Sequence, residues 1–190
     1  ERDKAMSGFR RRYKENTTLQ RMAKLIADTI IVICAAYMVM ALLCTRAHII
    51  GNSMNDLLSN GQTVLINKLP YAFTSPKRYD VIAFEASGVS SSRIYVKRVI
   101  GLPGETVQIK DGKVYINGKQ LEDDVVDSDI LTAGLAAEPV ILGMDEYFVL
   151  GDNRNNSEDS RFSNIAMVKR DNIIGSVWAV MSPLRDFKFI

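Results

Sequence analysis

A continuous apolar segment near the beginning of the chain constrains the fold most. Residues Leu25–Cys44 read LIADTIIVICAAYMVMALLC, and Asp28 is the only charged residue among them. An α-helix of about 20 apolar residues matches the thickness of the hydrocarbon core of a bilayer. A core helix that is apolar all round would need a larger protein around it. The sequence therefore predicts one membrane-spanning helix, an anchor over residues 25–45.

The charges on the two sides of the anchor predict its orientation. Cations gather before it, among them Arg10, Arg11, Arg12, Lys14, Arg21 and Lys24, whereas Arg46 stands alone just after it. By the positive-inside rule, residues 1–24 form a basic cytoplasmic tail and residues 46–190 lie outside the cytoplasm, next to the membrane. Two alternatives remain, a cleaved signal peptide and a lipoprotein anchored at Cys44.

The composition gives no argument for several other classes of protein. The formal net charge is +2, so nucleic-acid binding is not indicated. Cys34 and Cys44 both lie in the apolar segment, which argues against a disulfide framework. No Cys/His cluster has the spacing of metal ligands, and neither a metal nor another cofactor is implied. A Ser-His-Asp triad would depend on His48, which directly follows the anchor and is expected to be a bystander.

After His48 the pattern changes to short β-branched runs bounded by turn residues, which predict strands. These runs are Thr63–Asn67, Asp80–Phe84, Ile94–Ile100, Thr106–Lys110, Lys113–Ile116, Tyr147–Leu150 and Ile173–Met181. The dipeptide Asp111-Gly112 is a strong hairpin signal. The predicted fold class is mainly β, an antiparallel, barrel-like β domain preceded by one transmembrane α-helix. The polar stretch 121–138 is expected to be a surface loop or small insertion.

Lys97 is the first residue that indicates chemistry. The run Ile94–Gly101 reads IYVKRVIG, and alternation along a strand places Lys97 and Arg98 on opposite faces. If both faces are covered, at least one of these cations is buried. Burial lowers the pKa of an ammonium group, and a lysine that is neutral near pH 7 can act as a general base. The simpler interpretation is a strand-edge lysine that reaches solvent.

Two turns offer partners for such a lysine. Gly51–Leu58 reads GNSMNDLL and presents the hydroxyl of Ser53, although a serine in a turn often only closes a local hydrogen bond. Gly151–Arg161 reads GDNRNNSEDSR and is dense in hydrogen-bonding groups. This stretch is either a solvated turn with surface ion pairs or a loop that orients the lysine. A serine and a lysine together form a known nucleophile–base pair.

The three stretches together resemble bacterial type I signal peptidases, which are membrane-anchored serine proteases that remove signal peptides from exported proteins. The nucleophile motif of this family, G-x-S-M-x-P-T-L, falls on Ser53, with Gly51 and Met54 beside it. The lysine motif, K-R-V-I-G-x-P-G-[DE], matches KRVIGLPGE and places the general base at Lys97. The distal motif, G-D-N-R-x-x-S-x-D-S-R, matches Gly151–Arg161 throughout.

The resemblance also implies supporting roles and partners. The hydrogen bond to the catalytic lysine falls on Ser157, and a structural ion pair falls on Asp159 and Arg161, with Asp152 and Arg154 in the same loop. The expected substrates are signal peptides with small residues at the first and third positions before the cut. The expected surroundings are a lipid bilayer. The number of copies that assemble is not predicted.

Some residues depart from the family pattern. Asp56-Leu57 stands where Pro-Thr is usual, and Tyr79 replaces a glycine. Gly51 occupies a position where some members carry a hydroxyl that helps the oxyanion, which leaves the Ser53 backbone N–H as the main donor.

Other interpretations stay open at the level of the sequence. One is a catalytically inactive, membrane-tethered β module that binds exported peptides, and Asp56-Leu57 favours it. Another is a self-cleaving regulator with a Ser-Lys site, which would carry a DNA-binding module where this chain has an apolar span. The loop Leu69–Pro76 is expected either to rest on lipid through Tyr71 and Phe73 or to pack into the core.

Overall fold

The structure is a computed structural model that describes residues 17–86, 93–122, 124–126 and 128–190. Residues 1–16, which hold most of the predicted basic tail, lie outside this part. The chain divides after Leu42 into two compact units. The first contains nearly all of helix α2, and the second is built mainly from antiparallel strands.

Helix α2 spans Thr17–Leu43 and contains residues 25–43 of the predicted anchor, whereas Cys44 and Thr45 belong to strand β1 (Cys44–His48). Its segment Gln20–Leu43, of 24 residues, is long and apolar enough to cross a membrane by length and composition. At a rise of about 1.5 Å per residue it extends about 36 Å, slightly more than a hydrocarbon core. The helix begins before the predicted boundary because polar residues continue it, and it ends at Leu43 because Cys44 begins a strand.

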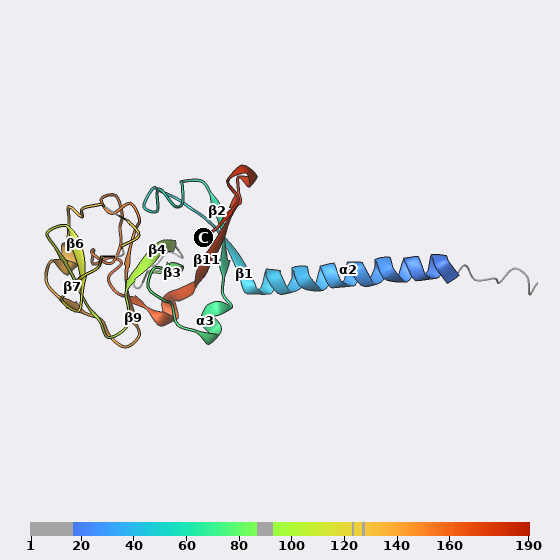
Figure 1. The fold of residues 1–190 in the computed structure, drawn as a ribbon, viewed down its shortest axis with the longest axis horizontal. Helices are drawn as coiled ribbons and strands as arrows, with labels where there is room; N and C mark the ends of the chain where they lie inside the picture. Colours follow the sequence, from blue (N-terminus) through green and yellow to red (C-terminus); the bar gives the residue numbers. More distant parts are fainter. Residues whose placement is uncertain (1–16, 87–92, 123, 127) are drawn as a thin grey trace, which may run out of the picture. The chain divides into compact units, whose positions relative to one another are not determined.

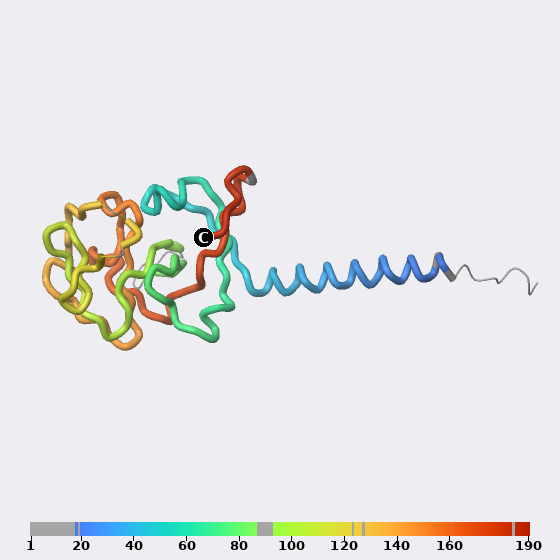
Figure 2. Tube along the Cα trace, in the orientation of Figure 1, coloured from blue at the N-terminus to red at the C-terminus, as the bar shows by residue number. Residues whose placement is uncertain are grey.

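Two antiparallel sheets form the second unit (Figure 1). Among the described residues, the larger sheet has the order β1-β2-β11-β3-β4-β9-β10, with β12 paired to β11. Its strands are β1 Cys44–His48, β2 Thr63–Asn67, β3 Val81–Glu85, β4 Ile94–Gly101, β9 Glu146–Leu150, β10 Val168–Lys169, β11 Ile173–Ser182 and β12 Lys188–Phe189. The smaller sheet has the order β7-β6-β5-β8, with β5 Thr106–Lys110, β6 Lys113–Ile116, β7 Lys119–Gln120 and β8 Val140–Ile141. Figure 2 traces the chain to its C-terminal residues, which return alongside β11.

The predicted mainly antiparallel β fold is confirmed, and each predicted strand is present with its ends moved by at most one residue. The larger sheet is not closed into a barrel, since β1 and β10 stand at its two ends. Strand β1 was not predicted. Its sequence, CTRAH, has no strand-like alternation, and it is extended because every residue pairs with β2, from Cys44 opposite Asn67 to His48 opposite Thr63.

Among the described residues, the remaining helices are short. They are α3 Pro70–Phe73 and the 3₁₀ turns Gly134–Ala137, Arg170–Asn172 and Leu184–Asp186. Tyr71 of α3 is buried and donates a hydrogen bond of 2.8 Å to Asp80, and its burial raises the pKa of the phenol. Of the two aromatic residues predicted to rest on lipid or to pack in the core, Tyr71 therefore packs in the core, whereas Phe73 is exposed.

Strand β4 carries the core and one part of the site together. Val96, Val99 and Ile100 are buried, and Lys97 and Arg98 are only 3% and 8% exposed, so both cations are taken out of water. Strand β3 pairs with β4 from Ile94 to Arg98, whereas β9 pairs with it only from Arg98 onward. Within the described residues, the first half of β4 therefore has one edge without a neighbouring strand.

Candidate active site

Ser53 and Lys97 meet in the structure as the sequence predicts. The Lys97 Nζ lies 2.6 Å from the Ser53 Oγ, within hydrogen-bond distance. Lys97 is held by a central strand that pairs with β3 at this position, and Ser53 lies in the turn that follows β1. The buried interpretation of Lys97 is therefore correct, and the interpretation in which its side chain reaches solvent is excluded.

The environment of Lys97 favours its neutral form. Its pKa is lowered from 10.5 to about 8, chiefly because burial removes water from the ammonium. The Asp159 and Glu158 carboxylates act in the opposite direction and hold the pKa above the value that burial alone would give. An amine with such a pKa is available as a proton acceptor at slightly alkaline pH.

The loop after β9 positions the nucleophile through the Ser53 carbonyl oxygen. The Asn153 backbone N–H donates to this oxygen at 3.0 Å, and the Asn153 side chain donates to the Asn52 carbonyl at 3.1 Å. Gly151 makes this approach possible. A Cβ on Gly151 would stand 2.5 Å from the Ser53 carbonyl oxygen and 2.2 Å from the Ser157 Oγ, so a side chain does not fit there.

The nucleophile turn is also fixed from its own side. Gly51 has φ +96°, a conformation that favours glycine, and its N–H donates to the Asn60 side chain at 2.9 Å. Met54 is 1% exposed and packs in the same core cluster as Leu58 and Val96. Ser53 is therefore held in place by the buried Met54 side chain after it and by the positive φ of Gly51 before it.

The predicted ion pair of the distal loop is present. The Arg161 guanidinium donates to both carboxylate oxygens of Asp159, at 2.8 and 2.9 Å, and both residues are buried. Asp159 also accepts from the Gly151 N–H at 3.1 Å, and Arg161 donates to the Thr132 carbonyl at 3.0 Å. This pair ties the loop to Gly151 and thus stabilises the position of Ser53.

Asp152 and Arg154 form ion pairs with residues outside their own loop. They do not pair with Arg161 or Asp159, as the interpretation of the loop as a solvated turn with surface ion pairs would predict. Asp152 receives two hydrogen bonds from Arg98, at 2.8 and 2.7 Å. Arg154 donates two hydrogen bonds of 2.5 Å to Asp124. The second buried cation of β4 is thereby neutralised, and the loop is bound to both β4 and the 121–138 stretch.

Ser157 lies beside the site but does not form the predicted hydrogen bond to Lys97. Its Oγ is buried and has no hydrogen-bond partner among the described residues. The close approach of Gly151 determines its position. A role for Ser157 in orienting the lysine therefore stays a prediction.

Ser53 and Lys97 open into a cavity of about 660 Å³. One wall is the segment from Arg46 to Met54, and the other is the segment from Arg93 to Lys97, which includes the unpaired edge of β4. His48 also lines this cavity, but its ring bonds to the Thr63 hydroxyl at 3.0 Å. The roles of Asn153 and Asp124 could not be predicted from the sequence, because each acts on a segment distant in the chain, and the role of Asn60 depends on the conformation of the turn between it and Gly51.

A serine hydroxyl against a buried amine of lowered pKa is the arrangement of serine hydrolases that use lysine as the base. Comparison with known proteins agrees, since residues 22–182 match the family described as signal peptidase, peptidase S26. The chain belongs to this family.

Individual relatives cover most of the chain. The signal peptidase I T of Bacillus subtilis (strain 168) is 32% identical over 190 aligned residues, covering 92% of this chain and 97% of that protein. The signal peptidase IB of Staphylococcus aureus (strain MRSA252) is 29% identical, covering 88% of this chain and 95% of that protein. The solved structure of a signal peptidase I from Enterococcus faecalis V583 is 35% identical and covers 55% of this chain and 97% of that chain, with a TM-score of 0.44.

Proposed function

We propose that this protein is a membrane-bound serine endopeptidase that removes N-terminal signal peptides from exported preproteins. The observation that carries the proposal is the 2.6 Å separation of the Ser53 Oγ from the Nζ of a buried lysine whose pKa is lowered. Membership of the signal peptidase family supports the choice of substrate.

The reaction follows from the positions of the two groups. Neutral Lys97 accepts the proton of the Ser53 hydroxyl while the Oγ attacks the carbonyl carbon of the scissile bond. The Ser53 backbone N–H stabilises the oxyanion, an effect worth about 2.7–4 kcal/mol per donor. Protonated Lys97 then gives its proton to the leaving amine. Lys97 next takes a proton from water, whose oxygen attacks the acyl-enzyme, and it returns this proton to the Ser53 Oγ as the bond to the signal peptide breaks and the signal peptide leaves.

The cavity that contains Ser53 and Lys97 suits an extended peptide. The unpaired edge of β4 from Ile94 to Lys97 offers backbone groups to which a peptide can add as a further strand. Ile49, Ile94 and Val96 give this cavity apolar surface beside Ser53. Such a lining fits small apolar residues before the cut.

The proposed topology places residues 1–24 in the cytoplasm, the anchor in the membrane and the β unit outside the cytoplasm. The cations before the apolar segment support this orientation. The boundary between anchor and β unit is best placed after Leu43, since Cys44 begins β1.

Cleavage of a preprotein tests the function. The purified full chain in detergent is incubated with a preprotein, next to Ser53→Ala and Lys97→Ala variants, and Asp171→Asn serves as a matched surface control. The wild-type chain and the control are expected to release the signal peptide, and the two site variants are expected to lose this activity. Equal, negligible cleavage by all four proteins would instead favour the inactive peptide-binding module.

A further inference from the structure

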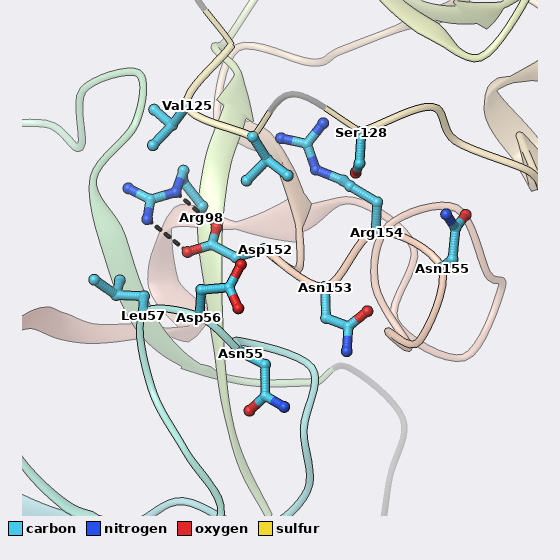
Figure 3. Close-up of a pocket in the computed structure, with 11 residues that line it drawn as sticks. Asn55, Asp56, Leu57, Arg98, Val125, Ser128, Asp152, Asn153, Arg154 and Asn155 are labelled. Carbon is cyan, nitrogen blue, oxygen red and sulfur yellow. Dashed lines mark hydrogen bonds and ion pairs between the residues drawn. The ribbon is translucent and has the colours of Figure 1, made fainter.

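A second cavity of about 660 Å³ adjoins the turn that carries the nucleophile. Its lining includes Asn55, Asp56 and Leu57 from that turn, and Arg98, Asp152 and Arg154 from β4 and the loop after β9 (Figure 3). The cavity that contains Ser53 and Lys97 is lined by neighbouring residues of the same two segments. In the turn its lining ends at Met54, and in β4 it ends at Lys97. The two cavities are therefore lined by consecutive residues of the turn that carries Ser53.

Among the described residues that line it, the second cavity has one negative charge without a compensating cation. The Arg98 guanidinium is neutralised by Asp152, with both hydrogen bonds formed, and Arg154 is neutralised in the same way by Asp124. Asp56 is exposed and has no ion pair among the described residues. An anionic ligand therefore finds no cation without a partner here, whereas a cationic group finds the Asp56 carboxylate.

The same cavity contains polar atoms that lack partners. The Asn55 Oδ1 is a buried acceptor and the Arg154 Nε is a buried donor, and within the described part of the chain neither has a hydrogen-bond partner. Arg154 as a whole is only 2% exposed. Buried polar groups are normally satisfied. Both atoms are covered by protein, whereas the Asp56 carboxylate is an exposed polar group of this lining that a substrate can reach.

The lining also has room for an aliphatic chain that ends in a charge. Leu57 and Val125 lie on the side of the cavity where Arg98 and Asp152 pair, as Figure 3 shows. A lysine or arginine side chain packs its methylene groups on apolar surface while its charged end meets a carboxylate. Asp56 and these apolar residues together therefore fit a basic side chain better than an acidic one.

The distance from Ser53 fixes which part of a substrate can reach Asp56. Asp56 is three positions after Ser53 in the chain, so their Cα atoms lie within about 11 Å. An extended peptide advances by about 3.3–3.6 Å per residue. The second and third residues after the scissile bond are therefore within reach of Asp56, whereas residues before the bond occupy the apolar cavity beside β4.

We propose that the second cavity receives the first residues of the mature protein, and that Asp56 selects a basic side chain at the second or third of them. This inference rests on the proposed function, because it assigns a binding site to the substrate residues that follow the same scissile bond. It runs against the charge of the whole chain, since a net charge of +2 by itself favours acidic substrates.

Peptides that differ at one position test the selection. Three fluorogenic peptides share one signal-peptide end and carry Lys, Gln or Glu at the second residue after the cut, and a second set varies the third. The ratio of kcat/KM for the Lys and Glu peptides is measured within each protein, so that changes in overall activity cancel. For wild type it is expected to be about three- to tenfold in favour of Lys at one of the two positions.

Variants assign this ratio to Asp56. Asp56→Asn is expected to bring the ratio close to one, and Asp56→Lys is expected to favour the Glu peptide. Asp171→Asn, which changes the net charge by the same amount as Asp56→Asn, is expected to leave the ratio as in wild type. In wild type alone, raising the salt from about 20 to 500 mM is expected to reduce the ratio, since salt screens exposed charges.

The outcomes separate the two proposals. A wild-type ratio near one at both positions, with the Gln peptides cleaved, overturns the selection by Asp56 and leaves the proposed function intact. A preference that Asp56→Lys does not reverse, or one that salt does not change, overturns it as well. Failure of the wild-type chain to cleave any peptide or preprotein contradicts the proposed function itself.

Discussion

The pH dependence of cleavage is a sharp consequence of the Lys97 environment. Only neutral Lys97 can take the Ser53 proton, so activity rises with pH through the pKa of the amine, which lies at about 8 instead of 10.5. The neutral fraction is then about one tenth at pH 7, about half at pH 8 and about nine tenths at pH 9. The rate is therefore expected to rise about fivefold from pH 7 to 8 and less than about twofold from pH 8 to 9.

The assay is kcat/KM for one peptide substrate between pH 6 and 10 in a single detergent and at constant ionic strength. Glu158→Gln provides an internal test, because the Glu158 carboxylate raises the pKa of Lys97. Its removal is expected to move the rising limb to lower pH, whereas Asp171→Asn leaves the limb in place. A rate that keeps rising tenfold per pH unit up to pH 10 would refute the reasoning, because it is the behaviour of an ordinary lysine.

Three further changes test the packing around the site. Gly151→Ala is expected to lower kcat/KM about 100-fold, because its Cβ would displace the Ser53 carbonyl; unchanged kinetics would show that the contact is not needed. Asp152→Asn leaves the buried Arg98 without its charged partner, and a drop of about 3–5 kcal/mol in the free energy of unfolding is expected by denaturant titration; a loss below 1 kcal/mol would argue against this pair. Lys97→Met removes a buried amine whose charge is disfavoured by about 3 kcal/mol, so the variant is expected to be inactive but more stable than wild type at pH 7. The gain in stability is expected to fall as pH rises from about 8 to 10.5, because wild-type Lys97 then loses its charge in the unfolded chain as well. A variant less stable than wild type at pH 7 would contradict this.

Local sequence patterns were enough to predict the main strands and to single out Lys97, whereas the choice of Ser53 as the nucleophile came from the family resemblance. The run around Lys97 combines a cation with apolar residues on both faces, and the structure buries it as that pattern indicates. The partners of the distal loop could not be predicted in the same way. Arg98 and Asp152 are 54 residues apart, and Arg154 and Asp124 are 30 apart, so these pairs exist only because the sheet brings the segments together.

At some positions the backbone conformation could also not be predicted from the sequence. Tyr79 has φ +74°, which a tyrosine rarely adopts, and this conformation agrees with the glycine expected there from the family pattern. Strand β1 is extended through its pairing with β2 and not through its own sequence. In both cases a tertiary contact decides a conformation that local preference does not favour.

A direct titration of the Lys97 side chain tests the central claim. The full chain is labelled with ¹³C at the lysine Cε, and the Lys97 signal, assigned by its absence from Lys97→Met, is followed from pH 6 to 11 by NMR. A midpoint at about 8 is expected, more than two pH units below an ordinary lysine. A midpoint near 10.5 would mean that Lys97 keeps its charge at neutral pH and cannot activate Ser53.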